Sequence, residues 1–333
     1  MVKIVCSLII ILGISPLGFS QTNFGEFIPN VMEDIQQFGE AYIAPAADGA
    51  MYNINSGWYT TAKSKSFPEF EISITSNTSL VPKSDNNFQL DPSAYNTIYF
   101  EEGNAPKTVS TIFGAQEQVS VFIDYDTGDG VETIEIELPP GIDTKDRSYL
   151  PSVFLQGNLG LFKGTELKLR YSPEVKFNDI STKVMGAALQ HEFTSWSNNS
   201  FGLPVAIAGL VSYSNFDGVY HISTDNAEDA AIVSELDSWS FSIITSKSIS
   251  NFELFAGIDY SVATSVSKFT GLYSLPEEGE IYEDILNQIT VTNKMNGLSG
   301  TLGASYLWSK LKINLALNIQ EYHNISLGFA YAN

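Results

Sequence analysis

The chain has 333 residues and a formal net charge of −21 at pH 7, because 38 Asp and Glu outnumber 17 Lys and Arg. Such an acidic surface repels nucleic acid, whose binding needs clustered Lys and Arg, so no nucleic-acid partner is expected. The single cysteine, Cys6, lies within a segment that export would remove. Disulfides, zinc–thiolate sites and cysteine nucleophiles are therefore excluded from the mature chain.

Residues 1–20 have the pattern of a secretory signal peptide. Lys3 supplies the positive charge, the run from Leu8 to Leu12 is a short apolar core, and Gly18 and Ser20 are the small residues before a cleavage site. We expect export, cleavage after Ser20 and location in the cell outer membrane.

Residues 21–66 do not have the pattern of barrel wall, and we expect them to form a plug. Asn30 and Glu33 form a capping box, and Gly39 is a plausible stop, which predicts a short helix between them. The small residues from Ala41 to Ala50 are expected to be irregular. A periplasmic tail packed on the rim is the alternative to a plug.

Residues 67–333 show the period-two alternation of β-strands. From Lys312 onward, for example, Ile313, Leu315 and Leu317 share one face of a strand and polar residues share the other. About twelve strands are predicted, near 68–78, 117–126, 131–138, 151–162, 165–172, 182–194, 203–214, 237–247, 250–262, 297–308, 311–322 and 325–333. The region 79–116 holds either two more strands or a long folded loop.

The spacing of these strands favours a transmembrane barrel over a soluble sandwich. Short turns near 162–164, 247–250 and 308–310 alternate with longer segments near 139–150, 215–236 and 262–296. Short turns on one rim and long loops on the other are typical of outer-membrane barrels, with both termini on the short-turn side. The fold class predicted is all-β, a transmembrane antiparallel β-barrel of about 12–14 strands with a short N-terminal helical plug. Aromatic girdles are expected from Tyr213, Trp239, Tyr260, Tyr306, Trp308 and Tyr322.

The polar face of the strands is expected to line the lumen. Its candidate residues are Glu71, Glu135, Glu137, Gln156, Asn158, Glu166, Lys168, Arg170, Glu253 and Asp259. Mixed charges across a lumen favour a filled barrel over an open porin, although lumen polarity is also generic.

No catalytic or metal motif is convincing, and we expect neither an enzyme nor a cofactor. His191 and Ser195 are the one candidate pair, but they lie about 13 Å apart along a continuous strand, too far for a nucleophile and its base. The run from Asp124 to Gly130 matches a calcium loop only in part, and no metal site is predicted.

The junction before the first strand resembles a known family. The stretch from Ala44 to Ala50, Asn55-Ser56-Gly57 and a first strand starting near Pro68 resemble the hatch-to-barrel junction of the long-chain fatty-acid transporter family. That family has Asn-Pro-Ala-Gly where this chain has Asn55-Ser56-Gly57. The whole chain is also similar to an uncharacterised group of Gram-negative outer-membrane proteins. The resemblance implies a plugged barrel that admits small hydrophobic compounds.

The function predicted is passive uptake of small hydrophobic compounds through the plugged barrel. Its ligand would contact an apolar pocket between plug and wall, at Phe27, Val31, Ile35, Phe38 and Trp58. The alternatives are a structural or partner-binding barrel of an envelope assembly and, less favoured, an outer-membrane lipid hydrolase. The partners expected are outer-membrane lipid, a small hydrophobic ligand, and the outer-membrane assembly machinery during biogenesis.

Overall fold

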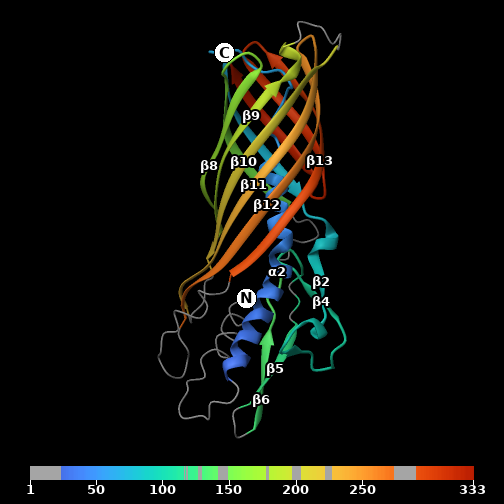
Figure 1. The fold of residues 1–333 in the computed structure, drawn as a ribbon, viewed down its shortest axis with the longest axis vertical. Helices are drawn as coiled ribbons and strands as arrows, with labels where there is room; N and C mark the ends of the chain where they lie inside the picture. The colour runs from blue at the N-terminus through green and yellow to red at the C-terminus, as the bar shows by residue number, and fades with distance from the viewer. Residues whose placement is uncertain are drawn as a thin grey trace.

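The computed structural model describes residues 24–115, 117, 119–126, 130–141, 149–177, 180–196, 204–221, 227–273 and 290–333. The signal peptide predicted over residues 1–20 lies outside them. In the described part, ten antiparallel strands close into a barrel (Figure 1). They are β1 (Phe70–Leu80), β7 (Tyr149–Gly160), β8 (Thr165–Phe177), β9 (Ile180–Glu192), β10 (Ala206–His221), β11 (Ala227–Ile249), β12 (Phe252–Tyr273), β13 (Thr290–Trp308), β14 (Leu311–Ile319) and β15 (Asn324–Ala332).

The barrel closes through β1, which pairs with both β7 and β15. Ile74, for example, lies opposite Leu155 on one side and Phe329 on the other. Closure gives each wall strand a neighbour on both sides, as the backbone amides of a sheet in lipid require. The antiparallel barrel with an N-terminal helix is as predicted from sequence, but it has ten wall strands and not twelve to fourteen.

The difference in strand number comes from the connection between β1 and β7. Strands β5 (Ser120–Asp126) and β6 (Val131–Glu137), predicted as wall, form a separate sheet with β3 (Ile98–Tyr99). Strands β2 (Asn87–Leu90) and β4 (Lys107–Ser110) form another. All five have seven residues or fewer, too short for the 9–11 residues that a membrane-spanning strand needs. The region 79–116 therefore holds a folded loop.

Helix α2 (Phe24–Asn55) is much longer than the short helix predicted, and it does not stop at Gly39. A Cβ atom at Gly39 would lie 2.9 Å from Cγ2 of Val291, so this glycine allows close packing against β13 and does not end the helix. Figure 1 shows the helix beginning beside β5 and β6 and running into the barrel. None of the helices in the described part of the chain is both long enough and apolar enough to cross a membrane as a helix.

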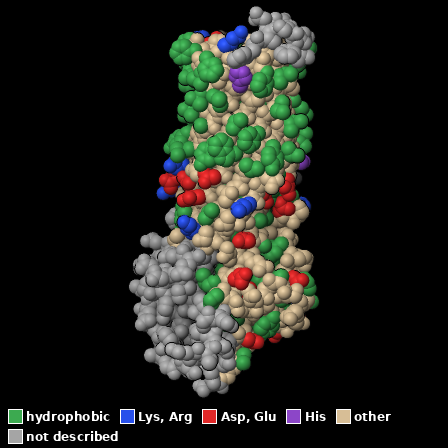
Figure 2. Space-filling model, in the orientation of Figure 1, with side chains coloured by type: hydrophobic (Ala, Val, Ile, Leu, Met, Phe, Trp, Pro, Cys, Tyr) green, Lys and Arg blue, Asp and Glu red, His purple; other side chains and the backbone are tan. Residues whose placement is uncertain are grey.

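An apolar belt surrounds the barrel. Figure 2 shows hydrophobic side chains gathered on the barrel half that carries the C-terminus, followed by a band rich in Asp, Glu and Lys. On β12 the belt comprises Phe252, Leu254, Ile258 and Tyr260, all exposed on the outer face. A closed barrel with an outward apolar belt is the form of an outer-membrane protein.

Strands β10 to β13 continue beyond this belt into segments that the sequence predicts as loops. They have 16 to 23 residues. Outside the belt the outer face meets water, and polar residues such as Glu235 and Lys268 occupy it. The apolar–polar alternation stops there although the strand pairing does not.

The turns predicted to be short lie on the rim where the chain ends, but the two rims differ less than predicted. On that rim the connection from β9 to β10 spans residues 193–205, and on the opposite rim β8 and β9 are joined by residues 178–179 alone. Strands β11 and β12 are joined at Ser250, and β13 and β14 at Ser309, both with positive φ. Helix α2 begins beyond the opposite rim, while the N-terminus, which was expected on the short-turn side, lies outside the described residues. Tyr322 is also not a girdle residue, because it is fully buried at the long-loop rim.

The belt predicts where a charge is not tolerated. Replacing Ile243, 70 % exposed on the outer face of β11, by Arg should lower the unfolding free energy in lipid vesicles by about 2–4 kcal/mol. The control Glu235→Arg, on the same face of β11 but beyond the belt, should change it by less than about 1 kcal/mol. Equal effects of the two substitutions would contradict this position of the membrane.

Candidate functional site

The lumen contains the second half of α2 and the segment after it, and this plug is the centre of the candidate site. It does not bring together the five residues predicted to contact a ligand. Val31 is buried in a cluster with residues of β2, β4, β5 and β6, and Phe27, Ile35 and Phe38 pack against that cluster. Trp58 belongs to a different cluster inside the barrel. The predicted single pocket is therefore not formed.

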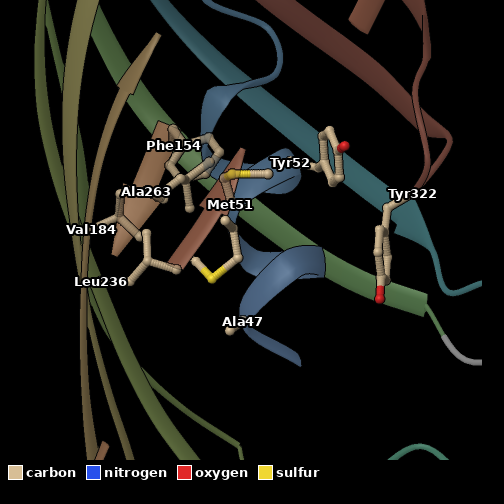
Figure 3. Close-up of a cluster of buried hydrophobic side chains, with 10 residues drawn as sticks. Ala47, Met51, Tyr52, Phe154, Val184, Leu236, Ala263 and Tyr322 are labelled. Carbon is tan, nitrogen blue, oxygen red and sulfur yellow. The ribbon is translucent and has the colours of Figure 1, made fainter. Parts of the chain in front are cut away.

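An apolar cluster lies between α2 and the wall in the long-loop half of the lumen. Its members are Ala47, Met51, Tyr52, Ile54, Phe154, Val184, Leu236, Ala263, Met295 and Tyr322. Figure 3 shows Met51 facing wall residues such as Phe154, Val184 and Ala263 on one side of the helix. On the other side Tyr52 stacks on Tyr322, with ring centroids 5.7 Å apart. We call these ten residues the upper cluster, where upper means toward the long-loop rim, which is drawn toward the bottom of Figure 1.

The wall caps the C-terminal end of α2. The guanidinium of Arg170 donates from Nη1 to the carbonyls of Ile54 and Ser56, at 2.9 Å each. Asn77 donates to the carbonyls of Asn53 and Ser56, also at 2.9 Å. The last carbonyls of a helix have no partner within it and carry partial negative charge, so a cation and an amide are suited to them.

Arg170 is itself held on several sides. It donates from Nε and Nη2 to Oε1 of Gln156, at 3.1 and 2.9 Å. Its guanidinium lies 4.0 Å from the ring centroid of Trp58 and 4.7 Å from that of Phe154. The side chain is fixed by hydrogen bonds and cation–π contacts together, which orients it for the helix end.

Glycines of the wall lie under the aromatic residues of the plug. Gly186 on β9 faces Trp58, and a Cβ atom at this glycine would lie only 2.9 Å from the indole ring. Gly257 on β12 faces Tyr59 and leaves no room for a Cβ atom. The hydroxyl of Tyr59 donates to Asp259 at 3.0 Å. The narrow lumen therefore fits this plug closely.

The predicted lumen residues divide into two groups. Glu71, Gln156, Asn158, Glu166, Lys168, Arg170, Glu253 and Asp259 lie on barrel strands and contact the plug or one another. Glu135 and Glu137 lie on β6, outside the barrel wall. Their prediction as lumen residues is wrong, because alternation alone cannot tell a wall strand from a strand of a folded loop.

The short-turn half of the lumen is charged. Glu71 accepts from Lys65 of the plug at 3.1 Å and from Lys312 of β14 at 2.7 Å, and Lys168 donates to Glu166 at 2.6 Å.

A polar cavity of about 10 Å³ lies between the plug and β12 to β14, beside Asp259 and Thr301. It has room for about one water molecule.

An acidic group marks the long-loop rim. Asp48 of α2 lies near Glu321 and Asp85, and Tyr322 donates to Asp85 at 2.6 Å. Partial burial and the neighbouring carboxylates raise the pKa of Asp48 to about 6.

His191 and Ser195 do not form a catalytic pair. Strand β9 ends at Glu192, between the two residues, but the Ser195 hydroxyl donates to the main-chain carbonyl of Glu192 at 2.8 Å. Nδ1 of His191 lies 2.9 Å from the Thr165 hydroxyl. Among the described residues no group of three or more His, Cys, Asp or Glu is placed to hold a metal ion.

Sequence reasoning missed several plug contacts. Asn53 and Tyr59 of the plug donate to wall residues, and Asn77 of the wall donates to a carbonyl of the plug. None of the three belongs to a sequence motif. The strand alternation places Arg170 in the lumen, but nothing in the sequence pairs it with the end of the helix.

A family model matches residues 1–333 under the description "Family of unknown function (DUF6588)". The chain belongs to this family. That agrees with the uncharacterised group predicted from sequence. A comparison with curated proteins finds no match.

Three solved structures illustrate the structural comparison. The outer membrane channel DcaP of Acinetobacter baumannii is 9 % identical over 80 % of this chain and 96 % of its own, with a TM-score of 0.19. A FadL homologue of Pseudomonas aeruginosa is 9 % identical over 80 % and 88 %, with a TM-score of 0.23. The toluene transporter TbuX of Ralstonia pickettii has the same identity and coverage, with a TM-score of 0.21.

The cap on α2 predicts the effect of changing its arginine. Arg170→Lys keeps the charge but loses the planar fork, so amides of residues 50–59 should exchange hydrogen about tenfold to a hundredfold faster. Hydrogen-exchange mass spectrometry in detergent measures this. The control Lys176→Ala, exposed on the same strand, should leave the plug unchanged. Faster exchange spread evenly over the barrel would contradict a local cap.

The raised pKa of Asp48 predicts a pH dependence. The folded protein binds a proton at the Asp48 carboxylate more tightly than the unfolded chain does. The free energy of unfolding therefore falls as pH rises from about 4 to about 6 and Asp48 ionises in the folded protein. Asp48→Asn should therefore be more stable than the unsubstituted protein at pH 7.5 and about equally stable at pH 4. Urea midpoints at the two pH values measure this, and a constant difference between the proteins would contradict it.

Proposed function

We propose that the protein is a plugged outer-membrane channel for passive uptake of small hydrophobic compounds. The observation that supports this most is the upper cluster, an apolar region between helix and wall in the long-loop half of the lumen. Ligand sites for small molecules are mostly apolar, with a few polar groups at their margin.

Two methionines make the upper cluster adaptable. Met51 of α2 and Met295 of β13 both belong to it. Methionine side chains are unbranched and flexible, so they can move aside for an apolar guest. In this proposal the ligand contacts are at Met51, Met295 and Phe154, while Phe27, Val31, Ile35 and Phe38 support the helix where it leaves the barrel.

A partner-binding barrel is the second candidate. The observation that favours it is the folded unit formed by β2 to β6 and the first half of α2, which has its own apolar core beyond the long-loop rim. A lipid hydrolase is not proposed, because the hydroxyl of Ser195 donates to the main-chain carbonyl of Glu192.

Native mass spectrometry on protein extracted from its own membrane in mild detergent tests the uptake proposal. We expect a co-purified hydrophobic molecule at stoichiometric occupancy. Ala263→Phe, which fills the upper cluster, should reduce that occupancy about tenfold, since overpacking costs about 1–3 kcal/mol. The matched control Ala256→Phe, on the same strand but on the outer face with Leu254 and Ile258, should not reduce it. A ligand-free mass with a protein partner retained would favour the second candidate.

A further inference from the structure

The segment Thr60–Ser66 crosses the short-turn half of the lumen without regular secondary structure. Wall side chains accept its main-chain N–H groups. Ala62 donates to Oγ of Ser246 at 2.9 Å, Ser64 to Oε2 of Glu192 at 2.9 Å, and Lys65 to Oε2 of Glu166 at 3.1 Å.

Other wall side chains donate to its carbonyls. Ser305 of β13 donates to the carbonyl of Thr60 at 3.3 Å, and Gln190 of β9 to that of Thr61 at 3.2 Å. Main-chain hydrogen bonds of this kind give affinity for an extended peptide whatever its sequence, and side-chain pockets add the preference.

The side-chain contacts of the segment define such a preference. Lys65 donates to Glu71 at 3.1 Å, and the Glu71 side chain is only 4 % exposed. Ala62 is fully buried, so a larger side chain has no space there. Thr61 donates to Glu253 at 2.8 Å. The wall thus fits a small residue followed, three positions later, by a cation.

A close approach at the rim lets the segment leave the lumen. A Cβ atom at Gly160, the last residue of β7, would lie 2.5 Å from the carbonyl oxygen of Lys65. Four wall carboxylates, at Glu71, Glu166, Glu192 and Glu253, contact the segment, which supplies two lysines. Two of these carboxylates also pair with wall lysines, Glu71 with Lys312 and Glu166 with Lys168. The remaining wall charge matches the two lysines of the segment.

We propose that this part of the wall is a binding site for extended, lysine-containing peptides, which the segment Thr60–Ser66 occupies as an internal ligand. The site lies below the upper cluster and does not depend on the uptake of hydrophobic compounds. Displacement of the segment exposes the same donors and acceptors to a peptide from outside.

The test uses a full-length variant in which Ala62, Ser64 and Lys65 are each replaced by Pro, because proline removes the three main-chain N–H groups that the wall accepts. Folding is checked by the heat-sensitive gel mobility of barrels. The probe is a fluorescein-labelled peptide with the sequence of residues 60–66 and blocked ends, followed by anisotropy. We expect saturable binding at least about tenfold tighter than to the unsubstituted protein, in which the internal segment competes.

Two controls separate recognition from general attraction to an acidic protein. A peptide with Glu in place of the residue equivalent to Lys65 should bind the variant about tenfold more weakly. Adding Glu71→Gln to the variant should abolish most of that difference. Where the triple-proline protein does not fold, the single variant Lys65→Pro is used for the same comparison. A folded variant that does not bind the peptide, or that binds both peptides equally, would overturn the proposal and leave the segment as an anchor of the plug.

Discussion

The plug depends on finding a partner for each polar group of its main chain inside the barrel. The helix end is the critical point, because the carbonyls of Asn53, Ile54 and Ser56 lie where the helix ends and the chain turns at Gly57, whose φ is +76°. Arg170 and Asn77 supply the missing donors from two different wall strands. An unpaired buried carbonyl would cost about 1–3 kcal/mol, so these side chains fix where the helix stops.

A narrow barrel imposes a second constraint, which is steric. A helix with ordinary side chains is about 10–12 Å wide, and the part of α2 inside the lumen reduces this with Ala46, Ala47, Gly49 and Ala50. The wall yields space in turn at Gly186, Gly257 and Gly297, where the larger rings of Trp58, Tyr59 and Tyr52 lie. Small residues on one surface therefore match large ones on the other. The positions of these small residues are set by the wall side chains that face them inside the barrel. The local sequence therefore shows no regular pattern that would predict them.

Much of the barrel could be predicted from sequence because lipid selects an apolar residue at every second position. Strands β14 and β15 follow that alternation almost residue by residue. The prediction failed where this selection is absent. In strands β5 and β6 apolar and polar residues also alternate, but the apolar ones pack into a core outside the barrel. Tyr322 is an aromatic residue near a strand end, but its side chain points into the lumen. The plug contacts were not predictable, since Arg170 meets Ile54 and Ser56 over more than a hundred positions of sequence, without any local pattern.

The two halves of the lumen differ in what it costs to enter them. In the long-loop half a guest would replace apolar contacts of Met51 and Met295 with its own, which leaves no polar group unpaired. In the short-turn half the same guest would separate the hydrogen bonds of Thr60–Ser66 and the ion pairs of Glu71 without replacing them. In the proposed uptake, binding and passage of a hydrophobic compound would therefore be separate steps with different barriers. For the proposed peptide ligand the order would be reversed, because a peptide carries the main-chain groups and the cation that the wall of the short-turn half already binds.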